Sequence, residues 1–182
     1  VPGEAISTLL YQFAGVELAC ADVVSVRQRV ADDGRYTPKY DEIVGDRPAV
    51  GSRRTWLVLR LCPQACMAAM AYRGDAAAAT AAATERIRQS LIRAGCRALT
   101  ASAEQMSAAT AALLADRALD LDRVEESWSH LDVNADFVTN YRIAGVDLTT
   151  RLLNDLATVR SNRTVTTIRI TATRAGEVSV AA

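Results

Sequence analysis

The sequence predicts an α/β protein, with a mixed α+β arrangement left open, in which helices flank a central mixed β-sheet. The first observation is an alternating strand pattern at 56–61, followed by an apolar run at 67–72. The second is a long Ala-rich amphipathic pattern at 75–94. The third is the return of short β-like runs and a helix after residue 128, which suggests two strand-strand-helix-strand units in tandem.

The first 52 residues predict a helix, a strand and a long loop. Residues 4–14 carry large apolar side chains at helical spacing, and 22–27 are rich in β-branched residues. Residues 32–52 are polar, contain several glycines and prolines, and show no period. A loop of this length is usually functional or mobile, so it is the candidate for contact with a partner, through Tyr36 and Tyr40. Together with Ile43, these two residues are expected to pack a turn of helix against the body. A plain mobile loop is the competing interpretation.

Residues 56–61 form the clearest predicted strand. Both of its faces are largely apolar, which predicts a central position in the sheet, with the three leucines at 57, 59 and 61 facing the core. The run 67–72 is expected to be a pairing strand, although Ala-Met-Ala also suits a helix. The helix at 75–94 presents a narrow alanine face that allows close packing, and Gly95 ends it.

Further elements follow as short, punctuated segments. They are, in chain order, a strand at 98–100, a helix from the Ser102–Gln105 capping box to about 115, β-like runs at 128–133 and 137–143, a helix capped by Asp147, an alternating antiparallel strand at 165–173, and a last strand at 178–182.

Composition limits the class of protein. The 21 basic residues balance 21 acidic ones, so no electrostatic footprint for nucleic acid is present. Half of the residues are hydrophobic, which is enough for one soluble domain covering 1–182. The four cysteines match no disulfide framework, so we expect reduced thiols and a cytosolic environment. Neither a leader nor an 18-residue apolar run is found, and both ends suggest a piece of a longer protein.

Catalytic and metal-binding patterns are scarce. The single histidine, His130, has no nucleophile pattern nearby, and a structural or surface role is the better interpretation. Cys62 and Cys66 lack a second Cys or His pair, and the glycines form no phosphate-binding loop. We therefore expect no cofactor, no metal and no small-molecule ligand.

Three weaker signals leave alternatives open. Asp120 and Asp122 have the Asp-x-Asp form of metal-dependent glycosyltransferases, although such pairs arise often by chance. Arg53 and Arg54 precede the clearest strand and could lie at a membrane face, bind a partner carboxylate, or simply be solvated. Trp128 is interpreted as a core residue more readily than as an interface anchor.

A set of short segments resembles one known family. Arg-Arg-Thr-Trp-Leu-Val-Leu-Arg at 53–60 is followed by Ala-Ala-Thr-Glu-Arg at 82–86, Leu-Thr-Ala at 99–101, Trp128 with His-Leu at 130–131, and Thr-Val-Thr-Thr-Ile-Arg at 164–169. In this order and spacing they are similar to EccE proteins, components of the actinobacterial type VII (ESX) secretion membrane complex. None of these segments is a catalytic signature.

The resemblance implies a structural role. EccE proteins carry two N-terminal transmembrane helices followed by a cytosolic domain, so the sequence is expected to be that domain without the preceding helices. They lie in the inner membrane with EccB, EccC and EccD, so this domain is expected on the cytoplasmic side. The leading hypothesis is a non-enzymatic subunit that stabilises the complex. The alternative is a sugar-nucleotide-dependent glycosyltransferase-like enzyme that uses Asp120 and Asp122.

Overall fold

The computed structural model describes residues 10–12, 16–28, 37–45, 51–113, 124–133, 136–156, 159, 161, 163–172 and 178–181. The chain divides into two compact units, a main unit of residues 1–100 and 144–182 and an inserted unit of residues 101–143. No helix in these described ranges has the length and apolar character needed to cross a membrane.

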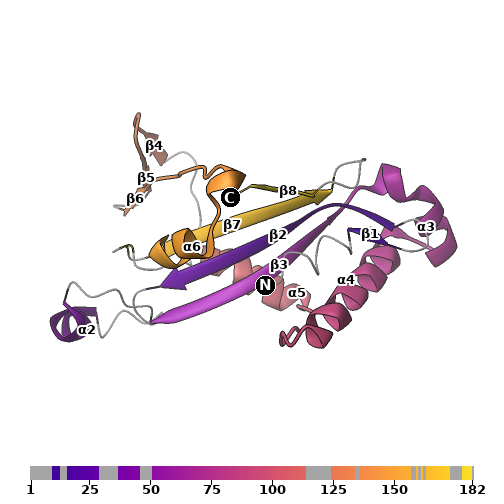
Figure 1. Cartoon of the computed structure of the whole chain (residues 1–182), viewed down its shortest axis with the longest axis horizontal. Coiled ribbons are helices and arrows are strands. Elements are labelled where there is room, and N and C mark those ends of the chain that lie inside the picture. Colours follow the sequence, from indigo (N-terminus) through magenta and orange to yellow (C-terminus); the bar gives the residue numbers. More distant parts are fainter. Residues whose placement is uncertain are drawn as a thin grey trace. The chain divides into compact units, whose positions relative to one another are not determined.

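The main unit is built on an antiparallel sheet (Figure 1). Its strands are β1 (Tyr11–Gln12), β2 (Val16–Gln28), β3 (Ser52–Leu61), β7 (Arg163–Ala172) and β8 (Val178–Ala181). The α/β class is confirmed, but the sheet is antiparallel in all pairings of the described strands, where a mixed sheet was predicted. The strands predicted at 22–27, 165–173 and 178–182 are confirmed over their described residues as β2, β7 and β8, and β2 starts earlier than predicted.

The central strand is β2, and not the strand that the sequence analysis placed there. β2 pairs with β3 on one side and with β7 on the other, while β1 pairs with its first two residues. In the described part of the chain β3 pairs with β2 alone. Its two apolar faces suggested a central position, but its first residues, Arg53 to Thr55, are exposed and only its leucines turn toward the core.

Helices occupy the connections between the strands. Their bounds are α2 (Thr37–Val44), η1 (Pro63–Cys66), α3 (Met67–Arg73) and α4 (Ala76–Arg93). The strand predicted at 67–72 is wrong because Met and Ala favour helix, Pro63 opens the preceding 3-10 turn, and Gly74 ends α3 with a positive φ of 99°. Residues 98–100 form no strand either, so the first of the two predicted tandem units is not present.

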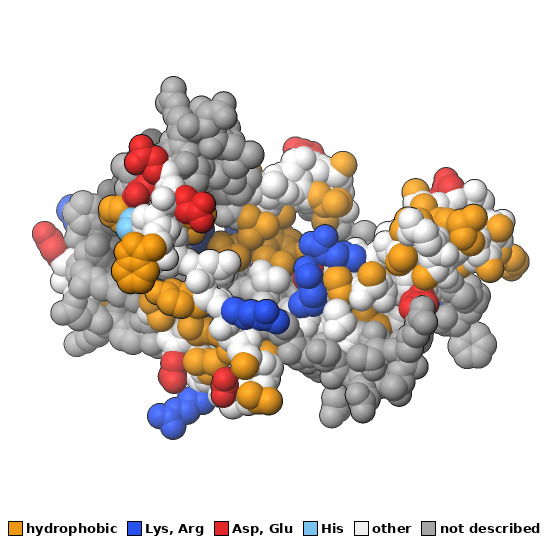
Figure 2. Space-filling model, turned by 90° about the horizontal axis from the view of Figure 1, so that it is seen from above, with side chains coloured by type: hydrophobic (Ala, Val, Ile, Leu, Met, Phe, Trp, Pro, Cys, Tyr) orange, Lys and Arg blue, Asp and Glu red, His pale blue; other side chains and the backbone are white. Residues whose placement is uncertain are grey.

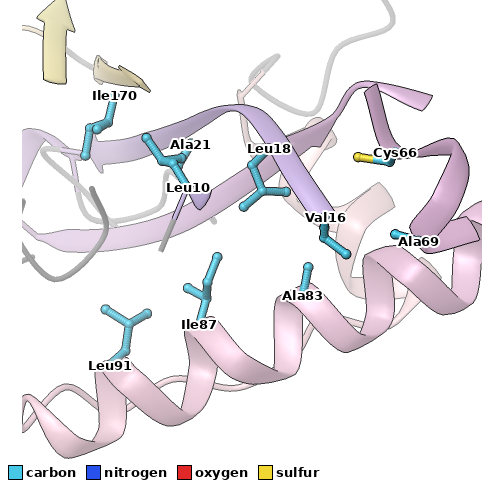
Figure 3. Packing of buried hydrophobic residues seen from close by; sticks show 10 residues of the cluster. All are labelled: Leu10, Val16, Leu18, Ala21, Cys66, Ala69, Ala83, Ile87, Leu91 and Ile170. Atoms are coloured by element: carbon cyan, nitrogen blue, oxygen red, sulfur yellow. The ribbon is translucent and has the colours of Figure 1, made fainter. Parts of the chain in front are cut away.

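The core lies between α4 and one face of the sheet. Ala83, Ile87 and Leu91 point from successive turns of α4 toward the buried residues of β2 (Figure 3). The leucines of β3 at 57, 59 and 61 pack at the edge of this cluster, as predicted. Each fully buried aliphatic side chain contributes about 1.5–3 kcal/mol, so this layer is the main source of stability.

The C-terminal part of the main unit returns to the sheet through two short helices, η3 (Gly145–Asp147) and α6 (Thr150–Leu156). Asp147 was predicted to cap the helix, but it lies in η3. The side chain of Thr149 caps α6, since its hydroxyl accepts the N–H of Leu152 at 3.1 Å. A threonine directly before the first helical residue is a normal N-cap.

The inserted unit contains a helix, α5 (Ala103–Leu113), and a small antiparallel sheet of β4 (Val124–Glu126), β5 (Leu131–Val133) and β6 (Asp136–Val138). The predicted capping box is confirmed, because Ser102 and Gln105 exchange side-chain hydrogen bonds of 2.9 and 3.2 Å. The β-like runs at 128–133 and 137–143 are confirmed only at 131–133 and 137–138.

The predicted N-terminal helix at 4–14 falls largely outside the described residues. Where the chain is described, Tyr11 and Gln12 form β1, and the neighbouring Leu10 is fully buried in the core. The helical prediction is therefore wrong at these positions. The spacing of apolar residues fitted a helix, but pairing with the start of β2 decides the local conformation.

Candidate functional site

A buried carboxylate at the centre of the sheet is bound by arginines from both neighbouring strands. Asp22 lies on β2 and is 1% exposed. Arg169 on β7 donates to it from Nε at 2.7 Å and from Nη2 at 3.0 Å. Arg60 on β3 donates from Nε at 3.0 Å. The three residues, called here the Asp22 cluster, connect three adjacent strands.

The electrostatics of the Asp22 cluster favour a structural role. The hydrogen bond from Arg169 lowers the pKa of Asp22, with Arg60 adding to the effect against the opposing influence of burial. Burial, and then the charge of Asp22, raises the pKa of the neighbouring Cys20 thiol. An ionised carboxylate held by two guanidinium groups is a poor general base, and a neutral thiol is a poor nucleophile. The cluster is therefore suited to joining strands.

The sequence analysis did not identify the Asp22 cluster, although a signal was present. Asp22 is an acid inside an apolar β-rich run, and a buried carboxylate needs cationic partners. Arg60 and Arg169 each lie in a predicted strand, on the face opposite to the core-facing residues. Only strand order, which the sequence does not reveal, shows that both strands flank β2.

The predicted partner contacts Arg53 and Arg54 lie at the other end of β3. Arg53 is exposed and its Nε donates to Ser25 Oγ at 3.3 Å, while Arg54, also exposed, follows it on the opposite face. Burial, and then the charge of Arg53, lowers the pKa of Arg27, whose Nη1 donates to the Leu153 carbonyl of α6 at 3.5 Å. Figure 2 shows basic side chains gathered among hydrophobic ones on one face of the molecule.

The loop predicted at 32–52 leaves the sheet at this same end, where Gln28 pairs with Ser52. It contains α2, so the expected turn of helix is confirmed, but Ile43 on it is 82% exposed and does not pack inward. Tyr36 and the side chain of Tyr40 lie outside the described part of the structure.

The four cysteines are free thiols; Cys20 and Cys66 are buried, as predicted, whereas Cys62 and Cys96 are only partly buried. Cys66 is buried, and its Sγ accepts the N–H of Glu17 at 3.2 Å and donates to the Glu17 carbonyl at 3.1 Å. The Cys62 thiol instead donates a hydrogen bond to the side-chain oxygen of the nearby Gln64. In the described ranges, no three His, Cys, Asp or Glu side chains are grouped to hold a metal ion. Asp120 and Asp122 lie outside those ranges.

The turn between β4 and β5 carries both His130 and Trp128. Ser127 N–H donates to the His130 carbonyl at 2.9 Å, which leaves Trp128 and Ser129 as a two-residue loop. His130 Nδ1 lies 3.1 Å from Ser127 Oγ and 2.9 Å from Ser129 Oγ. The imidazole is thus tied within its own turn, as expected for a structural histidine.

Trp128 does not lie in a core, contrary to the first interpretation. Its side chain is 99% exposed. A tryptophan in a β-like run is normally buried, but here the run is interrupted by the hairpin turn, and the turn carries the indole into solvent. It is the functional candidate that this geometry brings forward.

Comparison with known proteins identifies the family. The family model of EccE, the type VII ESX secretion system translocon, matches residues 49–143, which include β3, α4 and the Trp128 turn. The chain belongs to the EccE family.

Relatives in mycobacteria extend the match over the remainder of the chain. The chain is 34% identical over 196 residues to the ESX-5 secretion system protein EccE5 of Mycobacterium tuberculosis, an alignment covering 100% of this chain and 47% of that protein. It is 32% identical to EccE5 of Mycobacterium marinum, over 97% of this chain and 46% of that protein. It is 27% identical to the ESX-2 protein EccE2 of Mycobacterium tuberculosis, over 91% and 30%. The chain spans less than half the length of each.

Proposed function

We propose that this chain is a non-enzymatic structural domain of a type VII (ESX) secretion membrane complex, which it stabilises for protein export. Membership of the EccE family is the observation that carries this proposal. The glycosyltransferase alternative gains no support, because the matched family and relatives are named as secretion-system proteins.

The chemistry of the described residues supports an interaction role. The most buried acid, Asp22, has its carboxylate engaged by two arginines, and the single histidine is engaged by its own turn. Large apolar side chains are instead displayed on the surface, among them Trp128, Phe137 and Tyr72. Displayed aromatic residues favour recognition of another macromolecule.

The proposed partners are subunits of the EccB, EccC and EccD type, and the proposed location is the cytoplasmic side of the inner membrane. The end of the sheet from which α2 departs is a proposed contact region, through Tyr36, Tyr40, Arg53 and Arg54. The two exposed arginines would there bind carboxylates of a partner.

Co-purification with the native membrane complex tests the function. The full-length subunit lacking residues 1–182 should fail to support assembly of the complex and secretion of its substrates. Unchanged assembly and secretion would show that the proposal is wrong.

A finer experiment addresses the arginines. The double variant Arg53→Glu with Arg54→Glu should reduce co-purification. Arg97→Glu, a matched charge reversal at an exposed position after α4, should not. Equal co-purification of the two variants with the complex would show that this end of the sheet is not a contact region.

A further inference from the structure

The β4–β5 hairpin of residues 124–133, called here the Trp128 hairpin, presents a tryptophan that is 99% exposed, on a turn held by internal contacts. The two-residue loop is closed by the Ser127–His130 hydrogen bond. The His130 ring meets Phe137 edge-on, with centroids 5.1 Å apart and planes at 84°. His130 Nε2 also lies 3.5 Å from Asp132 Oδ2. The turn is thus braced by contacts from β5 and from β6, which limits the entropy lost when Trp128 is bound.

Further apolar surface accompanies the tryptophan. Phe137 on β6 is 75% exposed, and the register places it opposite Asp132, on the side of the small sheet that carries His130. Tyr141, just beyond β6, is 79% exposed. Scattered single apolar residues are common on protein surfaces, but three large aromatic side chains within 14 residues of chain are typical of a recognition surface.

Charge identifies the kind of partner. Glu125 and Glu126 are exposed on β4, and Asp132 is half-buried on β5. The sequence contains no lysine or arginine between residues 124 and 141; the nearest are Arg123 and Arg142. An acidic surface is repelled by anionic phospholipid and by nucleic acid, and it attracts basic polypeptide.

We propose that the Trp128 hairpin docks onto a basic segment of another subunit of the secretion complex, with the Trp128 indole entering an apolar pocket between lysine or arginine side chains of that segment. This proposal rests on the proposed function. Burial of the indole provides affinity, stacking of a cation on its face adds to it, and the exposed carboxylates of Glu125 and Glu126 orient the partner.

Site-specific photo-crosslinking tests the proposal in the full-length subunit. p-Benzoylphenylalanine is incorporated at position 128, and at position 72 as the control, since Tyr72 on α3 is an aromatic residue that is 85% exposed in the main unit. After irradiation of cells, the complex is purified and the linked peptides are identified by mass spectrometry. Position 128 should link to a lysine- or arginine-rich peptide of another subunit, and position 72 should not link to that peptide. A link to lipid, to nucleic acid or to an acidic peptide, or no link, would overturn the proposal.

Two variants measure the contribution of each group. Trp128→Ser should weaken association of the subunit with the complex by about thirtyfold, the loss typical of a central interface aromatic. Glu125→Lys with Glu126→Lys should weaken it at low salt and much less at 0.5 M salt, since ionic strength screens exposed charges. Tyr72→Ser is the matched control for the aromatic change. Circular dichroism should match the wild type because each altered side chain is exposed.

The outcomes separate this inference from the proposed function. If the wild-type subunit does not co-purify with the secretion complex, the proposed function fails. If the wild type co-purifies and Trp128→Ser does so equally, only the docking role of the hairpin is wrong.

Discussion

Asp22 and Arg169 lie directly opposite each other on β2 and β7, and the guanidinium donates to both carboxylate oxygens, at 2.7 and 3.0 Å. The side chain of Asp22 is 2% exposed, whereas the side chain of Arg169 is 50% exposed. Arg60 reaches the same carboxylate from β3. One acid on the central strand therefore connects residues that are far apart in the sequence.

Replacing this acid should destabilise the fold. Asp22→Ala leaves two guanidinium groups without their shared carboxylate, and the expected loss is about 3 kcal/mol, the lower end for breaking a buried pair, because both arginines can turn toward water. Urea denaturation measures it. Arg151→Ala is the control, since its contact with Asp155 is 3.9 Å long and exposed, and it should cost less than about 1 kcal/mol. Equal effects of the two substitutions would contradict the prediction.

The Asp22 cluster should also make stability depend on pH. The pKa of Asp22 is lowered in the folded state, chiefly by Arg169, from an unfolded value of about 3.9. Its contribution is therefore complete above the unfolded pKa and is lost as pH falls through the folded pKa. The stability difference between wild type and Asp22→Asn should stay constant from about pH 5.5 to 8 and shrink below about pH 4. Urea titrations across this range measure it, and parallel curves down to pH 3 would refute it.

Local patterns predicted those elements whose conformation is decided locally. The alternation at 165–173, the alanine face of α4 and the reciprocal Ser102–Gln105 bonds each involve neighbours within a few residues. Periodicity and capping are sufficient in such cases. The same reasoning found the family through the order of its segments, without a site.

Long-range pairing decided most of the features that the sequence did not predict. Residues 67–72 are an exception, because the local preference of Met and Ala for helix prevails over the strand there, and α3 packs through Ala69. Tyr11 and Gln12 fitted a helical stripe but pair with β2. The exposure of Trp128 depends on which two residues form the turn. If the turn is predicted one residue away from its true place, Trp128 is assigned to the strand instead. The partners of Asp22 required the strand order.

The contact between α4 and the sheet should tolerate little loss of volume. Ile87 is 1% exposed and faces β2 from the middle of α4. Ile87→Ala should destabilise by about 3 kcal/mol and Ile87→Val by about 1 kcal/mol, since each leaves a cavity that the sheet fills incompletely. Arg93→Ala, on an exposed position of the same helix, should stay within about 0.5 kcal/mol. Chemical denaturation compares the three variants; a tolerated Ile87→Ala would mean that the layer is loosely packed.

The contribution of the α5 capping box to the free energy of unfolding should be measurable separately from core packing, because its residues are exposed. Ser102→Ala removes the acceptor for the Gln105 N–H and should cost about 1 kcal/mol. Ser107→Ala, at an exposed interior position of the same helix, should be neutral or slightly stabilising, since alanine has the higher helix propensity. The two serine variants differ only in position. A similar response of both in urea denaturation would show that the cap adds nothing.

The two units should unfold together, in agreement with a single domain over 1–182. The described residues of the inserted unit form one helix and three strands of three residues, and Ala112 is the buried residue among them. Small sheets of this kind are marginal without further packing, so this unit should have little stability by itself.

Two-dimensional NMR in urea tests whether the two units unfold together. The folded amide signals of Ala112 in α5 and Ala83 in α4 should disappear with one midpoint, as expected for a single cooperative transition. A peptide of residues 101–143 alone should show the narrow amide dispersion of an unfolded chain. An earlier loss of Ala112, or a dispersed spectrum of the peptide, would mean that the inserted unit is an independent domain. Ile87→Ala supplies the cross-check, because a substitution in the main core must then lower the midpoint of Ala112 as much as that of Ala83.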